Sequence, residues 1–222
     1  MASKVKSKIF LIDFEDSFTY NIVAEIFSRG QMVEVIPYAL FSTWKKTIQF
    51  KETQYYQIIW GPGPGHPEDY LDVLSVMSKW LDKKNIFHWG ICLGHQMLMY
   101  TLGFRVKRCR YPIHGQNFSF TIPKWSCFPK IYQNKIAKVQ RYNSLVPFIR
   151  KEVIKLLKNS RKGQYVFRDK EIWAYYDRQI ISYQFHPESV GTSTKDAFFW
   201  PLLNFSYNRR DGTQTTPLRR SL

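Results

Sequence analysis

The sequence predicts a single α/β domain with a mostly parallel central sheet, flanked by helices and extended by antiparallel strands. Three observations indicate this fold. Short apolar runs alternate with amphipathic helical segments in the first half, glycines frame Cys92 directly after one of these runs, and strand-like segments separated by turns fill the second half. With 222 residues, of which 44% are hydrophobic and 17% aromatic, the chain can bury a core of this size.

The first half follows the order of a β-α-β unit. An apolar run closing on Asp13 predicts a strand, and Asp16 and Ser17 then supply capping groups for a helix, which Gly30 ends. Pro37 stops the next alternating run. The expected elements, in order, are a strand over 8–12, a helix over 18–27, a strand over 32–36, a short helix around 44–50 and a strand over 56–60.

Glycine and proline alternate over residues 61–67, which excludes a helix or an interior strand and predicts a rigid loop at the carboxyl end of a strand. A rigid loop with free N–H groups suits an anion, and a simple turn is the alternative. The next segment, residues 70–83, is expected to be an amphipathic helix with one apolar stripe, formed by Leu71, Leu74, Met77 and Leu81.

Cys92 lies at the centre of the motif Gly-x-Cys-x-Gly, directly after an apolar run. This pattern predicts a strand that delivers a nucleophile into a sharp turn, because flanking glycines keep such a strained elbow free of clashes. The helix expected over 93–102 then begins at the thiol, where its positive potential favours the thiolate. The alternative is an inert, buried cysteine.

The second half consists of short strands interpreted as antiparallel extensions of the sheet. Turns separate these runs, and Asp177 and Arg178 lie at the tip of an expected hairpin. The expected elements are strands over 104–109, 117–122, 136–142 and 165–167, a basic helix over 148–158, hairpin strands over 172–176 and 180–185, and a last helix over 195–207.

His186 and Glu188 stand two residues apart around Pro187 at the end of the second hairpin strand, so both side chains can point to the same side. Beside a thiolate, such a pair supplies a general base and the group that orients it. A surface histidine near a glutamate is the alternative. The remaining histidines are expected to be structural or receive no assignment: His66, His88, His95 and His114.

The positive charge is the main feature that indicates a function other than catalysis at Cys92. Lysine and arginine outnumber aspartate and glutamate by 33 to 17, a net charge of +16 that permits binding to nucleic acid or to an acidic partner. The charges are scattered and no recognition-helix, zinc-finger or RNA-binding signature accompanies them, so nucleic-acid binding is not favoured. Residues 1–208 are expected to form the domain, and residues 209–222 a basic, flexible tail.

The three cysteines show no C-x-x-C spacing, which indicates a reducing compartment and no metal site. The basic segment 1–8 is followed by an apolar run too short for a signal peptide or a membrane span. We therefore expect a cytoplasmic protein without contact to a membrane.

Three motifs together resemble those of the class I glutamine amidotransferases. They are Gly63-Pro64-Gly65, the segment from Gly90 to Gln96 and the segment from Gln184 to Ser189, and the match extends over nearly the whole chain. Residues 13–21, Asp-Phe-Glu-Asp-Ser-Phe-Thr-Tyr-Asn, further resemble the chorismate-directed members, anthranilate synthase component II and its para-aminobenzoate (aminodeoxychorismate) counterpart.

The resemblance implies a single-domain fold of that family that hydrolyses L-glutamine, with Cys92, His186 and Glu188 as the catalytic triad. The N–H groups of Gly63 and Leu93 would form the oxyanion hole. The substrate would be bound by Gly63, Pro64, Gly65, Gln96, Ser144 and Leu145. Two positions depart from the family's usual pattern: Asn143 stands where His is common, and Gln116 where Lys is common.

The resemblance also implies a partner, a chorismate-binding synthase subunit (component I) that receives the ammonia and holds Mg²⁺, while this chain needs no cofactor. The product is anthranilate, for tryptophan, or 4-amino-4-deoxychorismate, for folate. Two alternatives stay open: a catalytically silent basic protein of the same fold that binds nucleic acid or an acidic partner, and a cysteine peptidase or related hydrolase using the same triad.

Overall fold

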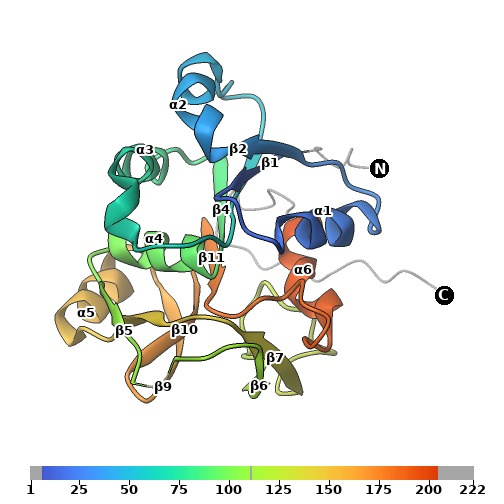
Figure 1. The fold of residues 1–222 in the computed structure, drawn as a ribbon, viewed down its shortest axis with the longest axis vertical. Helices are drawn as coiled ribbons and strands as arrows, with labels where there is room; N and C mark the ends of the chain where they lie inside the picture. The colour runs from blue at the N-terminus through green and yellow to red at the C-terminus, as the bar shows by residue number, and fades with distance from the viewer. Residues whose placement is uncertain (1–6, 111, 205–222) are drawn as a thin grey trace.

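A sheet of nine strands runs through the middle of the protein in a computed structural model that describes residues 7–110 and 112–204 (Figure 1). Its strand order is β2-β1-β3-β4-β11-β10-β8-β5, with β9 paired to β10. Along this order, the neighbours among β2, β1, β3, β4 and β11 pair in parallel. All other pairs in the sheet are antiparallel. The predicted α/β fold with an antiparallel extension is confirmed.

The strands of this sheet are short, as the apolar runs of the sequence indicate. They are β1 (Lys8–Asp13), β2 (Glu34–Pro37), β3 (Tyr56–Trp60), β4 (Ile86–Ile91), β5 (Arg105–Arg108), β8 (Leu145–Phe148), β9 (Gln164–Arg168), β10 (Glu171–Tyr176) and β11 (Ile180–Tyr183).

Helices cover both faces of the sheet (Figure 1). On one face lie α1 (Thr19–Phe27) and α6 (Lys195–Leu203). On the other lie α2 (Tyr38–Thr47), the 3-10 helix η1 (Pro67–Tyr70), α3 (Leu71–Trp80), α4 (Leu93–Thr101) and α5 (Lys151–Ser160). No helix within the described ranges is both long enough and apolar enough to cross a membrane.

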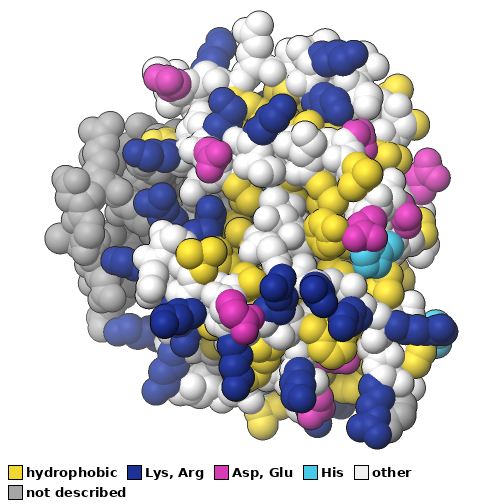
Figure 2. All heavy atoms as spheres, turned by 90° about the vertical axis from the view of Figure 1, so that its left-hand side faces the viewer, with side chains coloured by type: hydrophobic (Ala, Val, Ile, Leu, Met, Phe, Trp, Pro, Cys, Tyr) yellow, Lys and Arg dark blue, Asp and Glu magenta, His cyan; other side chains and the backbone are white. Residues whose placement is uncertain are grey.

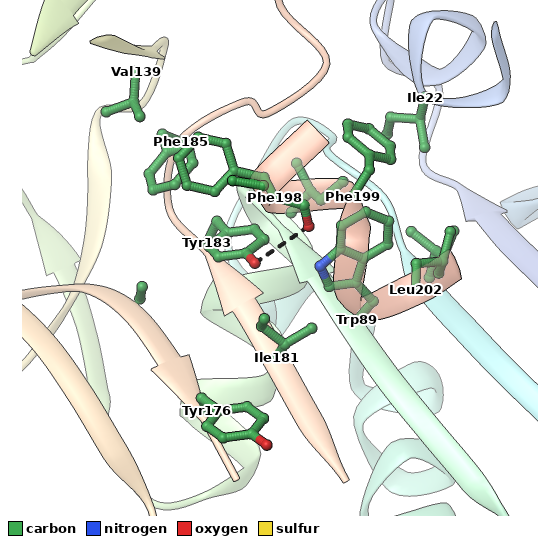
Figure 3. Close-up of a cluster of buried hydrophobic side chains, with 14 of the residues drawn as sticks. Ile22, Trp89, Val139, Tyr176, Ile181, Tyr183, Phe185, Phe198, Phe199 and Leu202 are labelled. Carbon is green, nitrogen blue, oxygen red and sulfur yellow. Dashed lines mark hydrogen bonds between the residues drawn. The ribbon is translucent and has the colours of Figure 1, made fainter. Parts of the chain in front are cut away.

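The alternation of side chains along β1 supplies both hydrophobic cores. Ile9 and Leu11 pack in the core under α1 and α6, whereas Phe10 and Ile12 pack in the core under α2, α3 and α4. In the first core the ring of Trp89 packs edge-on against Phe199, with centroids 5.1 Å apart (Figure 3). A strand with both faces buried has a nearly continuous apolar sequence. This is why the parallel strands could be predicted clearly from the sequence.

The structure corrects the interpretation of several segments. The short helix expected around 44–50 is α2, which begins directly after Pro37. The segments expected as antiparallel extensions near 117–122 and 136–142 are β6 (Gln116–Thr121) and β7 (Ile136–Arg141), which form a separate two-stranded sheet. Their apolar side chains pack on the core under α6. The strand β8 lies where no strand was expected.

Two details of the helices also differ. No side chain caps α1; instead, Asp16 Oδ1 accepts a hydrogen bond of 2.8 Å from the N–H of Phe18, the residue before the helix. In α3, Leu71 is 66% exposed and lies outside the buried face, which consists of Val73, Leu74, Met77 and Trp80. The last helix ends at Leu203, and the expected tail over 209–222 and the domain end at 208 lie outside the described residues.

Candidate active site

The candidate site lies where two neighbouring parallel strands end. β4 and β11 are paired, with Ile91 opposite Tyr183, so the residues that follow each strand emerge at the same edge of the sheet. The N–H of Cys92 donates a hydrogen bond of 2.9 Å to the carbonyl of Tyr183. Cys92 therefore lies beside the segment that carries His186.

Cys92 has backbone dihedrals of φ 52° and ψ −104°, outside the regions that residues with a side chain favour. The flanking glycines are required by close approach: a Cβ on Gly94 would lie 2.0 Å from the carbonyl oxygen of Trp60. A Cβ on Gly90 would lie 2.8 Å from the backbone of Gly94. The sharp turn predicted from the glycine spacing is confirmed, and α4 begins at the next residue.

His186 and Glu188 are joined by a hydrogen bond of 2.7 Å from Nδ1 to Oε1, and both residues are buried. Burial alone would lower the pKa of the His186 imidazole, but the negative charges of Glu188 and Cys92 outweigh it and raise this pKa well above 6.5. Within the described residues, Nε2 of His186 is buried without a hydrogen-bond partner. Phe18 and Tyr142 pack on the imidazole, with ring centroids 5.0 and 5.1 Å away.

The two residues expected to form an oxyanion hole lie together. A Cβ added to Gly63 would come within 2.9 Å of the Leu93 side chain. Neither the N–H of Gly63 nor that of Leu93 donates a hydrogen bond within the part of the chain that the structure describes. Both N–H groups are therefore free to bind a ligand, and their role as an oxyanion hole stays a prediction.

Two of the expected substrate-binding residues are in direct contact. Nε2 of Gln96 donates to the carbonyl of Leu145 at 2.8 Å and to Oε1 of Gln184 at 3.3 Å. Ser144 is exposed next to them.

Pro64 and Gly65 make their contacts elsewhere. The carbonyl of Pro64 accepts a hydrogen bond of 3.0 Å from the hydroxyl of Tyr70, in η1. A Cβ on Gly65 would meet Asp69 of η1, and the φ of +79° at this position also favours glycine. These two residues shape the loop that carries Gly63.

Sequence reasoning missed two polar residues at the site. Nε2 of Gln184 lies 3.9 Å from the Sγ of Cys92, and Gln184 is fully buried. Its position two residues before His186, on the same face of an extended segment, was the available signal. Arg141 is 1% exposed at the end of β7. The alternation of β7 puts it on the buried face with Ala137 and Val139, but an arginine is ordinarily exposed, and the signal was passed over.

Two other histidines are structural. Burial lowers the pKa of His88 to about 4 and that of His95 to about 3, so both rings stay neutral at physiological pH. Trp60 Nε1 donates to His88 at 3.1 Å, and His95 bonds the hydroxyl of Ser182 at 2.8 Å. Among the described residues, no group of three or more His, Cys, Asp or Glu side chains is placed to hold a metal ion.

Comparison with known proteins identifies the family. The sequence pattern of the family described as glutamine amidotransferase class-I matches residues 10–203. The anthranilate synthase component 2 of Saccharolobus solfataricus is 34% identical over 201 residues, covering 87% of this chain and 96% of that protein. The anthranilate synthase component 2 of Helicobacter pylori (strain ATCC 700392 / 26695) is 28% identical over 186 residues, covering 83% of this chain and 90% of that protein.

Two further similarities extend this comparison. A Schizosaccharomyces pombe protein provisionally named aminodeoxychorismate synthase is 32% identical over 208 residues, covering 90% of this chain but 26% of that protein. The crystal structure of a glutamine amidotransferase from Thermotoga maritima has the same fold. Its TM-score is 0.60 at 18% identity, over 82% of this chain and 76% of that chain. The chain belongs to the class I glutamine amidotransferase family.

Proposed function

We propose that this chain is the glutaminase component of a two-chain synthase, hydrolysing L-glutamine and passing the ammonia to a chorismate-using partner. The observation that carries the proposal is the meeting of the strained Cys92 elbow with the buried His186–Glu188 pair at one edge of the sheet. The relatives named anthranilate synthase component 2 and aminodeoxychorismate synthase support both the reaction and the kind of partner.

In the first half of the proposed reaction, the Cys92 thiolate attacks the side-chain amide carbon of glutamine. The carbonyl oxygen becomes an oxyanion, which the N–H groups of Gly63 and Leu93 stabilise. The imidazolium of His186 gives its proton to the leaving nitrogen, so ammonia departs and a thioester remains on Cys92. Glu188, bonded to Nδ1, stabilises the charged imidazole and directs Nε2 toward the reacting atoms.

In the second half, water attacks the thioester carbon. The neutral imidazole of His186 accepts the proton of the water, the bond to sulfur breaks, and glutamate leaves. The free thiolate and the imidazolium are thereby restored. These steps need no metal ion or cofactor in this chain, and Mg²⁺ would be held by the chorismate-binding partner.

The test is reconstitution of the complex. The full chain, carrying a tag, is used to recover its synthase partner from the source cells, and the complex is supplied with chorismate, Mg²⁺ and glutamine labelled with ¹⁵N at the side-chain amide. The proposal predicts ¹⁵N in anthranilate or in 4-amino-4-deoxychorismate, and the product identifies the pathway. An unlabelled product, or no aminated product with a chorismate-using partner present, would contradict it.

The basic surface is compatible with one alternative function, that of a catalytically silent protein that binds nucleic acid. Figure 2 shows lysine and arginine side chains spread over the face that carries β5 and α5. The exposed basic residues of these elements include Arg105, Lys107, Arg108, Lys155 and Lys158. Salt-dependent binding to DNA or RNA by a chain without glutaminase activity in the complex would favour this alternative. The cytoplasmic location stays a prediction.

A further inference from the structure

Arg141 is a buried cation next to the candidate active site. Its guanidinium is 1% exposed and lies over the ring of Trp173, 4.3 Å from the centroid. Nη2 donates to Oε2 of Glu171 at 3.1 Å. Burial lowers the pKa of this guanidinium, whereas the charge of Glu171 acts in the opposite direction. A buried charge is costly unless it is paired, so these contacts fix both the charge and the orientation of the side chain.

From Arg141 a chain of hydrogen bonds runs to the thiol. Nε of Arg141 donates to Oδ1 of Asn143 at 3.1 Å, and Nδ2 of Asn143 donates to the carbonyl of Leu145 at 2.9 Å. The same carbonyl accepts the 2.8 Å bond from Nε2 of Gln96. Gln96 in turn contacts Gln184, whose amide nitrogen lies beside Cys92.

Arg141 fixes the orientation of the Asn143 side chain, which in turn donates to the Leu145 carbonyl. A guanidinium can only donate, so the oxygen of the Asn143 side chain must face it and the nitrogen must face Leu145. The carbonyl of Leu145 can only accept, which requires Gln96 to present its nitrogen there as well. The remaining atom, Oε1 of Gln96, accepts no hydrogen bond within the described ranges and is left for a ligand that donates.

We propose that Arg141 is a positioning residue of the glutaminase site: through Asn143 and the shared Leu145 carbonyl, it holds the Gln96 side chain with its oxygen toward the bound amino acid. The α-ammonium group of glutamine is a donor of the required kind. This inference rests on the proposed function, and it assigns to the relay the binding of the amino-acid end of the substrate rather than the chemistry at sulfur.

Two electrophiles separate these roles in the full chain. 6-Diazo-5-oxo-L-norleucine carries the amino-acid end of glutamine and alkylates a glutaminase thiol, whereas iodoacetamide reacts with the same thiol without that end. The test variants are Arg141→Lys and Asn143→Leu, the second of which breaks the relay while leaving the buried ion pair in place. The matched control is Arg168→Ala, because Arg168 also lies over Trp173, at 5.8 Å, but is exposed and outside the relay.

The expected result is a loss of about tenfold or more in the second-order rate of inactivation by the glutamine analogue in both test variants. Their rates with iodoacetamide should stay within about twofold of the wild type, and the control should be unchanged with both reagents. Thermal unfolding checks that each variant is folded, and Asn143→Leu alone decides the question if Arg141→Lys does not fold.

An equal loss with both reagents would show a general structural effect and overturn the inference, and so would full reactivity of Asn143→Leu toward the analogue. Failure of the wild-type chain to react with the analogue while it reacts with iodoacetamide would contradict the proposed function itself, and the inference with it.

Discussion

Nδ1 of His186 lies 2.7 Å from Oε1 of Glu188, although the two residues are separated by a single proline. Both side chains are buried, so neither can exchange its partner for water. In the proposed reaction this bond leaves Nε2 as the ring atom that exchanges a proton with the thiol or the substrate, as in a triad whose carboxylate selects the tautomer.

Glu188→Gln keeps the size of the side chain but removes the charge that stabilises the imidazolium. We expect kcat for glutamine to fall by about 100-fold or more, with a much smaller change in KM. Steady-state measurement of glutamate release by the complex checks this. A kcat within about threefold of the wild type would show that the 2.7 Å bond has no part in catalysis.

His186 should titrate above the ordinary value for histidine. Because the charges of Glu188 and Cys92 outweigh burial in the wild type, the NMR titration midpoint of its imidazole is expected well above 6.5. Glu188→Gln removes the larger of the two charges that oppose burial, so the midpoint should fall. A midpoint that is the same in both proteins would contradict the electrostatic account.

The raised pKa also sets the pH dependence of stability. The folded protein holds the His186 proton more tightly than the unfolded chain, so this contribution to stability is complete below about pH 6.5 and is lost as the pH rises through the folded pKa. Urea unfolding of the wild type and His186→Gln should therefore show a difference in free energy that shrinks as the pH rises above about 6.5. A difference that grows with pH would contradict the sign.

Gly94→Ala should disrupt the elbow, because its new Cβ would lie 2.0 Å from a backbone oxygen that cannot move independently. We expect a loss of more than about 3 kcal/mol in the free energy of unfolding. Gly30→Ala is the control: its φ is +74° but the space around it is open, so its cost should stay near about 1 kcal/mol. Equal costs in the two variants, measured by urea unfolding, would contradict the close approach at Gly94.

The elbow could be predicted because its cause is local. Gly90 and Gly94 stand at a fixed spacing around Cys92, and that spacing is visible in the sequence. The pairing of His186 with Glu188 is also local. Arg141 and Gln184 could not be assigned in the same way, since their contacts come from distant parts of the chain: Arg141 pairs with Glu171, and the amide of Gln184 lies beside Cys92.

Long-range packing also explains which elements were predicted wrongly from the sequence. The segment that forms β8 is too short to be predicted as a strand from its sequence. It becomes a strand because β5 and β10 supply its hydrogen bonds. Similarly, nothing in the alternating pattern of β6 and β7 distinguishes an added pair of strands in the main sheet from a separate ribbon packed on the core.

Phe198→Ala should cost about 3–5 kcal/mol, because its ring is fully buried against Phe185 and Tyr183 (Figure 3) and also contacts Phe120. Trp200→Ala, on the same helix but 37% exposed, should cost clearly less. Thermal unfolding of the two variants compares them directly. A larger loss for Trp200 would show that α6 buries a different face in solution.

The most direct test of the account is the activity of Cys92→Ala in complex with the synthase chain. We predict that glutamine-dependent product formation falls to background, while product formation from added ammonium stays within about twofold of the wild type. Retained glutamine hydrolysis by the alanine variant would show that the nucleophile is not Cys92.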